Sequence, residues 1–233
     1  MKEPAVNTSL MQRMNRLKVL RYIKENPGSA RCTISEATGL SLGAVTNLTG
    51  FLLKENLITE SGYISEDRVG RKRIKLKVNA DSHKIICVFI KEKTAGVYLT
   101  DLSGKKIKSV LLDIGFGKIE EVINKICGTI VSFNEKITAV GVSLSALVLD
   151  KGKRVVSSSL NFDNLNIKKL MEETLGYPVF VDNISISKAL GYIKNNGELK
   201  KSRIVFADME EGFGGVYVNK GEVIRDIPLE IGH

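Results

Sequence analysis

The sequence predicts an α/β protein of two domains, with a winged helix-turn-helix over residues 1–80 and a mixed α/β domain over residues 81–233. Three helical patterns and a cationic hairpin predict the first domain. Apolar strands alternating with helices predict the second. Charge divides in the same way, because residues 1–80 hold 14 Lys and Arg against 7 Asp and Glu, whereas residues 81–233 hold 21 against 19. A basic domain joined to a near-neutral domain is typical of a protein that binds a polyanion.

Composition excludes several classes of protein. With 43% apolar and 26% charged residues, the 233-residue chain has the composition of a globular protein and not of a disordered one. No apolar run approaches the roughly 20 residues that cross a bilayer, so no membrane contact is expected. The N-terminus lacks the features of a signal peptide, which predicts a cytoplasmic protein. The three cysteines form no C-x-x-C pair, so neither a zinc ribbon nor a disulfide framework is predicted.

The first two elements are predicted to be helices. The first helix should run from Ser9 to Glu25 and turn one apolar stripe inward, formed by Met14, Leu17, Leu20 and Ile23. The second should begin at Thr33, which stands in a capping-box spacing with Glu36. It should end at Gly39, where the chain can adopt a positive φ.

The third helix is the candidate recognition helix. Ser41 can cap it, and it should extend to about residue 56. Val45, Leu48 and Leu52 fall at positions i, i+3 and i+7, so they should face the core. The outer face is small and polar and has no carboxylate before Glu55, as a helix in the major groove requires. This face consists of Gly43, Ala44, Thr46, Asn47 and Gly50.

The hairpin that follows is predicted to be a wing. Residues 57–59 form one strand and residues 71–78 the other. In the second strand Ile74, Leu76 and Val78 alternate with Arg71, Arg73, Lys75 and Lys77, so one face is apolar and the other cationic. An edge strand protected by lysines would show the same alternation, but the helices beside it favour DNA binding. The residues expected at DNA are Ser41, Ala44, Thr46, Asn47, Arg71, Lys72 and Arg73.

The remaining residues are predicted to form a mixed sheet with helices. Residues 79–82 form a short linker. Strands are expected at 85–90, 95–101, 107–114, 137–144, 178–181, 204–208 and 215–218. Helices are expected at 119–133, 165–175 and 184–194, the second of them ended by Gly176. Three strands followed by alternating helices and strands indicate an α/β domain.

Nearly the whole chain resembles the ROK family of repressors, open reading frames and kinases. The winged helix of the family's repressors is similar to RLKVLRYIKENPGSARCTISEATGLSLGAVTNLTGFLLKENLI followed by GRKRIKLKVNA. The family's sugar site is similar to SSSLNFDNLNI and YPVFVDN…KALG, and EIGH is a family signature. The resemblance implies an actin- and hexokinase-like body of the ribonuclease H-like type. The second lobe is expected to be incomplete and the chain to be truncated at its C-terminus.

Two positions depart from the pattern of the family's kinases. The Asp-x-Gly-Gly-Thr segment, whose glycines approach ATP, is replaced by Phe89-Ile-Lys-Glu-Lys93. The catalytic Asp of the family's Asn-Asp pair is replaced by Ile184, which cannot accept a proton from a sugar hydroxyl.

The glycine loop that follows is a third departure. The family's Gly-Thr-Gly-x-Gly loop is replaced by a segment that begins with Glu210 and Glu211. The sequence shows no cation to balance these carboxylates, which would repel a triphosphate. The sequence therefore predicts no catalytic residue and no cofactor, and an ATP-dependent sugar kinase is the disfavoured alternative.

The resemblance also implies a ligand site. Asn161, Asn183, Glu230 and His233 match positions around the family's sugar and suit recognition of hydroxyls, although each Asn could be an ordinary cap or loop residue. The family's zinc cysteines lie beyond His233, so no metal site is predicted. The expected function is a homodimeric regulator on a palindromic double-stranded operator, with a sugar or sugar phosphate as effector. Control by a protein partner is the other alternative.

Overall fold

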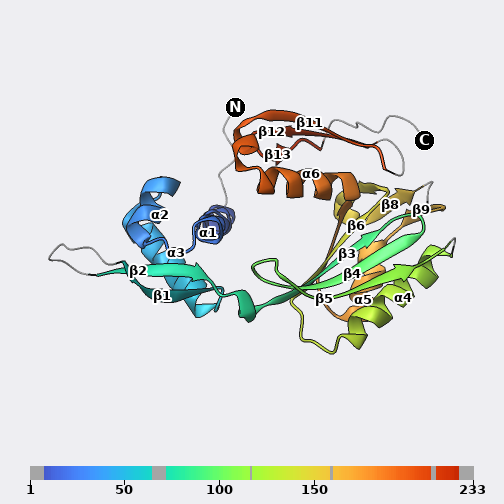
Figure 1. Ribbon diagram of the computed structural model, residues 1–233, viewed down its shortest axis with the longest axis horizontal. Coiled ribbons are helices and arrows are strands. Elements are labelled where there is room, and N and C mark those ends of the chain that lie inside the picture. The colour runs from blue at the N-terminus through green and yellow to red at the C-terminus, as the bar shows by residue number, and fades with distance from the viewer. Residues whose placement is uncertain (1–7, 65–71, 116, 158–159, 211–213, 226–233) are drawn as a thin grey trace. The chain divides into compact units, whose positions relative to one another are not determined.

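The computed structural model describes residues 8–64, 72–115, 117–157, 160–210 and 214–225 (Figure 1). They fall into two compact units. The N-terminal unit extends to His83 and includes Asp101–Lys105, and the C-terminal unit begins at Lys84 and contains the rest. Arg71, Glu211, Glu230 and His233 lie outside the described residues.

The N-terminal unit consists of three helices and an antiparallel hairpin. Its elements are α1 (Thr8–Glu25), α2 (Arg31–Thr38), α3 (Leu42–Lys54), β1 (Ile58–Ile64), β2 (Arg73–Val78) and the 3₁₀ helix η1 (Ala80–Ser82). In the hairpin Ile58 lies opposite Val78. On its other side β2 is bridged by Ser29: the Leu76 N–H donates to the Ser29 carbonyl, and the Leu76 carbonyl accepts from the Gly28 N–H. The strand that carries the cationic residues is therefore held on both sides.

The core of the N-terminal unit corrects the prediction for α1. Met14 and Leu17 do not face inward, since their side chains are 60% and 46% exposed. Ile23 is fully buried as predicted, and Leu20 packs half-buried against the same core. Val19, which was not predicted to face inward, is also fully buried. The N-terminal half of the stripe is shifted by one residue, because Arg16 faces α3 and lays its guanidinium 3.7 Å from the centre of the Phe51 ring. The other members of this core are Ile34, Val45, Leu52, Ile58 and Leu76.

The two ends of α2 test its predicted start and stop signals. Helix α2 begins at Arg31 with Ala30 as a cap that makes no side-chain hydrogen bond, so the capping box predicted at Thr33 is wrong. The early start follows from Ala30, which is 2% exposed and directly follows the Ser29 bridge. The prediction for Gly39 is confirmed, because it ends α2 at a φ of 69°.

The C-terminal unit is built on a five-stranded sheet in the order β10-β6-β3-β4-β5. Strands β3, β6 and β10 are parallel, and β4 and β5 are antiparallel. The elements are β3 (Lys84–Ile90), β4 (Thr94–Asp101), β5 (Lys106–Asp113), α4 (Ile119–Ser132), β6 (Ala139–Leu144), α5 (Ile167–Leu175) and β10 (Val179–Asn183). Figure 1 shows α4 and α5 next to each other, and their apolar residues share one core with the sheet.

Two smaller sheets complete the C-terminal unit. Strands β7 (Leu147–Leu149), β8 (Arg154–Ser157) and β9 (Phe162–Leu165) form one of them, with the 3₁₀ helix η2 (Asp150–Gly152) between the first two strands. The other contains β11 (Arg203–Asp208), β12 (Gly214–Asn219) and β13 (Glu222–Val223), and it packs against α6 (Ile184–Asn195), which the 3₁₀ helix η3 (Gly197–Lys201) follows. The sequence did not predict β7, β8, β9 or β13. The described residues thus form a mixed α/β fold.

Candidate functional site

The outer face of α3 is small, polar and accessible. Gly43, Thr46, Asn47 and Gly50 are exposed, whereas Ala44 is half-buried and less accessible than predicted. Helix α3 begins beside Ser41, whose Oγ accepts a hydrogen bond from the Ala44 N–H at 3.2 Å, which confirms the predicted cap. The Thr46 hydroxyl donates to the Leu42 carbonyl at 2.8 Å, so its methyl group and both lone pairs of its oxygen are left for an external contact.

The inner face of α3 is fixed by a polar contact that the sequence analysis missed. Thr49 is completely buried; its Oγ1 accepts from Arg31 Nε at 3.0 Å and donates to the Thr46 carbonyl at 3.1 Å. Arg31 also lies 3.6 Å from Glu60 on β1. The predicted core residues Val45 and Leu52 are buried as well. Helix α3 is thereby fastened to both α2 and the hairpin, and its outer face is held rigidly.

The hairpin separates apolar from cationic side chains as predicted. Leu76 is fully buried, whereas Lys72, Arg73 and Lys77 are exposed and Lys75 is half-buried. Lys72 Nζ lies 6.0 Å from the centre of the Tyr63 ring on β1, a cation–π contact that keeps its charge near the strand. The exposed face of the described part of the hairpin offers positive charge to solvent.

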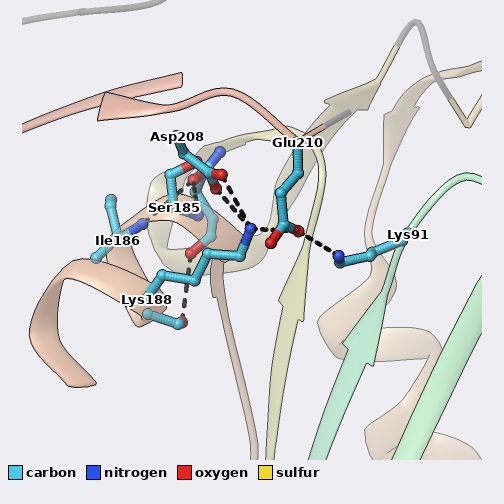
Figure 2. A network of polar contacts seen from close by, with 8 residues as sticks. Lys91, Ser185, Ile186, Lys188, Asp208 and Glu210 are labelled. Atoms are coloured by element: carbon cyan, nitrogen blue, oxygen red, sulfur yellow. Dashed lines mark hydrogen bonds and ion pairs between the residues drawn. The ribbon is translucent and has the colours of Figure 1, made fainter. Parts of the chain in front are cut away.

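A second polar cluster surrounds the segment that follows β11 (Figure 2). Lys91 and Lys188 donate to the same oxygen of Glu210, Oε2, at 2.5 and 2.9 Å. Lys188 also contacts both oxygens of Asp208, at 3.0 and 2.9 Å, and Ser185 Oγ donates to Asp208 at 3.0 Å. The expectation that no cation balances this acidic segment is therefore wrong for Glu210. The lysines are supplied by the β3–β4 turn and by α6.

The cluster sets the ionisation of its members. Hydrogen bonds from Lys91 and Lys188 lower the pKa of Glu210 to about 2. Partial burial disfavours the charged form of Lys188, but its hydrogen bonds to Asp208 and Glu210 together outweigh burial and raise its pKa. Glu210 and Lys188 are therefore both ionised at neutral pH.

The residues predicted to contact a sugar are not gathered in one hollow among the described residues. Asn183 caps α6: its Oδ1 accepts from the Ser185 N–H at 2.7 Å, and its Nδ2 donates to the Ala146 carbonyl at 2.8 Å. Asn161 is exposed and lines a hollow of about 270 Å³ that Asn183 does not line. The sugar contacts of Asn161, Asn183, Glu230 and His233 stay predictions.

Three further observations concern chemistry and location. Ile184, at the position of the kinase aspartate, is 8% exposed and begins α6. Across the described part of the chain, no three His, Cys, Asp or Glu side chains are grouped so that they could hold a metal ion. None of the helices described is both long and apolar enough to span a bilayer.

Comparison with known proteins identifies the family of the chain. A model described as the ROK family matches residues 85–233. A protein named xylose repressor from Caldicellulosiruptor bescii is 25% identical over 97% of this chain and 60% of its own length. Another protein of that name, from Bacillus spizizenii, is 24% identical over 91% of this chain and 57% of its own length. The chain thus spans about 60% of the length of these curated relatives.

Solved structures resemble the chain over different lengths. A ROK family transcriptional regulator described as a homologue of the Escherichia coli MLC protein has a TM-score of 0.79 at 21% identity, over 95% of this chain and 58% of its own. A ROK family glucokinase from Streptomyces griseus has a TM-score of 0.56 at 20% identity, over 62% of this chain and 47% of its own. These likenesses show a shared fold.

Proposed function

The chain belongs to the ROK family, and from this premise we propose that it is a DNA-binding transcriptional repressor of sugar-related genes. The observation that carries the proposal is the joint exposure of two surfaces in the N-terminal unit. One is the small polar face of α3, and the other is the cationic face of β2. In this proposal the unit is a winged helix-turn-helix, in which α2 and α3 form the helix-turn-helix and the hairpin is the wing.

The two surfaces suit different parts of a duplex. Helix α3 enters the major groove, where Asn47 can pair with an adenine edge through two hydrogen bonds. Ser41 and Thr46 stand near bases or adjacent phosphates. Arg71, Lys72 and Arg73 contact phosphates or the minor groove, which positions the protein without reading sequence directly. Because Thr49 and Arg31 hold α3 from inside, little conformational entropy is lost when α3 docks.

The relatives support this function. The curated proteins named xylose repressor match more than nine-tenths of this chain. The transcriptional regulator matches 95% of it, whereas the glucokinase matches 62%, and the difference is about the size of the N-terminal unit. A chain that shares this additional unit with regulators is better explained as a regulator than as a kinase.

The C-terminal unit is proposed to sense a ligand without catalysis. Ile184 replaces the catalytic aspartate and is buried, so no carboxylate is available there to deprotonate a sugar hydroxyl. The effector is a sugar or sugar phosphate that alters DNA affinity in the cytoplasm, and control by a protein partner is the second candidate. A phosphotransfer assay with ATP and a panel of hexoses should show no turnover. Turnover that is abolished by changing Glu211 or Asn183 would contradict a non-catalytic C-terminal unit.

Selection from a random duplex library tests the proposed function directly. The whole chain, at about 50 mM salt, should enrich a two-fold symmetric site with half-sites about one helical turn apart, because helix-turn-helix dimers read operators in this way. Binding to the selected duplex should be at least about 1,000-fold tighter than binding to a scrambled one. Failure to retain any duplex at this salt concentration would overturn the proposal.

A further inference from the structure

The turn between β4 and β5 belongs to a different unit from its two strands. Strands β4 and β5 are part of the five-stranded sheet of the C-terminal unit, but Asp101–Lys105, called here the β4–β5 turn, belongs to the N-terminal unit. The chain therefore passes between the two units three times, after His83, after Thr100 and after Lys105. A change in the sheet thus has a covalent route into the N-terminal unit besides the segment that follows β2.

Leu102 fastens the β4–β5 turn to two elements of the N-terminal unit. Its N–H donates to the Ala80 carbonyl at 3.0 Å, and its own carbonyl accepts from Lys24 Nζ at 3.2 Å. Ala80 begins η1, which follows β2 after one residue, and Lys24 lies in the last turn of α1. One residue of the turn therefore contacts both the segment after the cationic strand and the end of the first helix.

The β4–β5 turn is held in one shape by its own polar groups. Asp101 is 8% exposed, and its Oδ1 accepts from Ser103 Oγ at 2.6 Å and from the Lys105 N–H at 2.9 Å. Gly104 has a φ of 95°, a conformation that glycine adopts without steric cost. A turn that is fixed in this way moves together with the ends of the strands that it joins.

The opposite ends of β4 and β5 lie at the hollow of about 270 Å³ described above. Glu92 shortly precedes β4, Ile114 directly follows β5, and both residues line this hollow. Figure 1 shows β4 and β5 side by side, and they are paired along their length. Each strand has eight residues, which corresponds to roughly 27 Å. The two strands therefore form one hydrogen-bonded element between the hollow and the β4–β5 turn.

We propose that strands β4 and β5 and their turn couple the C-terminal unit to the DNA-binding surface, and that Lys24 and Leu102 are the positioning residues of this coupling. It rests on the proposed repressor function, in which a ligand of the C-terminal unit alters DNA affinity. The contact has two states, with Lys24 bound to the Leu102 carbonyl or released from it. A ligand shifts this equilibrium by as much as its affinities for the two states differ.

The contact reaches both surfaces that are proposed to bind DNA. Helix α1, which ends beside Lys24, stacks its Arg16 on Phe51 of α3. Strand β2, which carries the exposed cations, leads directly into the segment that Leu102 holds through Ala80. A displacement of the β4–β5 turn is therefore delivered to α3 and to the cationic strand together.

Hydrogen exchange of the whole chain, without DNA or ligand, tests the contact. Lys24→Met removes the donor and keeps an apolar side chain. The amides of the β4–β5 turn and of the adjoining ends of β4 and β5 should then exchange at least about threefold faster, as the loss of one hydrogen bond predicts. Lys54→Met, in the last turn of α3, is the matched control and should leave these amides unchanged. Unchanged exchange in Lys24→Met, or equal acceleration in Lys54→Met, would overturn the coupling.

Gly104→Ala tests the same contact from the side of the turn. Alanine is strained at a φ of 95°, so the turn should loosen and the amides of η1 and of the last turn of α1 should exchange faster. Gly176→Ala is the matched control, because it also places alanine at a positive φ, 71°, and a Cβ at either glycine meets no atom within 4 Å. Combining Lys24→Met with Gly104→Ala should accelerate exchange no more than the stronger single change does. Effects that multiply would show two independent contacts and would contradict the coupling.

Addition of the selected duplex connects the contact to the function. Binding of the duplex to the unmodified chain should change exchange in the β4–β5 turn by at least about threefold, because coupling between two sites is reciprocal. In Lys24→Met the duplex should still bind, but the turn should no longer respond. A turn that does not respond in the unmodified chain, although the duplex is bound, would refute the coupling. An unmodified chain that binds no duplex would instead refute the proposed function, and the exchange measurements without DNA would still test the contact.

Discussion

In the C-terminal unit four lysines face carboxylates from the same unit. Lys84 and Lys108 both contact Glu135, and Lys91 and Lys188 both contact Glu210. In the N-terminal unit the lysines of β2 alternate along the strand with residues that face the core, so they lie on the opposite face of the strand. Lys72 directly precedes β2. Lys72 and Lys77 are exposed there.

The difference separates two uses of positive charge. A lysine paired within its own unit neutralises a carboxylate and contributes little to long-range attraction, and an exposed pair adds little to stability. A lysine on an exposed strand face is available to a phosphate, and its binding releases counterions from DNA. The overall excess of positive charge therefore says less about partners than the way in which that charge is paired.

The largest expected effect tests whether the two units have separate cores. Leu76→Ala should lower the free energy of unfolding of the N-terminal unit by about 2–5 kcal/mol, because a fully buried side chain leaves a cavity. Native-state hydrogen exchange should show faster exchange of α3 amides, while α4 amides keep their protection. The matched change Ile126→Ala, also in a fully buried side chain, should have the opposite pattern. An equal loss of amide protection in both units would show that they unfold as a single cooperative fold.

The next effect concerns the exposed cations. Changing Lys72, Arg73 and Lys77 to Ala together should weaken duplex binding by about 100-fold at 50 mM salt and lower the slope of log K against log salt by about 2.7, since each lost phosphate contact removes about 0.9. Fluorescence anisotropy over a salt series measures both quantities. Scrambled and selected duplexes should be affected alike, because phosphate contacts carry no sequence information.

A triple substitution of Lys to Ala in the C-terminal unit is the matched control for the hairpin variant. It removes the same charge from exposed lysines of the C-terminal unit, at Lys136, Lys151 and Lys194. Binding should change by less than about threefold. If this control weakened binding as much as the hairpin variant, net charge and not the hairpin would explain the affinity.

Much of the fold followed from local patterns, and the errors have tertiary causes. Gly39 and Gly176 end helices at positive φ, and Ser41 caps α3, as short-range rules predict. The stripe of α1 was misplaced because the Arg16–Phe51 contact joins residues of different helices. The lysines around Glu210 were missed because Lys91 lies 119 positions away along the chain. Strands β7, β8 and β9 have only three or four residues each, too few to show a period.

A smaller effect tests base readout by α3. Asn47→Ala should weaken binding to the selected duplex by about tenfold and leave binding to the scrambled duplex unchanged. Asn47 is exposed, and two hydrogen bonds from one side chain to one base are worth about 1–3 kcal/mol of discrimination. Repeating the selection with the variant should relax preference at one position in each half-site. The hairpin variant and this one would then separate affinity from specificity. An equal loss on both duplexes would place Asn47 at a phosphate.

The smallest effect separates the two roles assigned to Ser41. Its Oγ accepts from the Ala44 N–H, so Ser41→Ala should lower the free energy of unfolding by about 1 kcal/mol. Ser41→Asp keeps a hydrogen-bond acceptor at the cap, and its negative charge lies near the positive N-terminal end of the helix dipole. The free energy of unfolding should therefore be retained. The same carboxylate would repel phosphates at the predicted interface, and duplex binding should fall although the fold is intact. Thermal unfolding and anisotropy on the same samples measure the two outcomes. Ser41→Asp that binds duplex as tightly as the unmodified chain would show that the N-terminal end of α3 lies away from DNA.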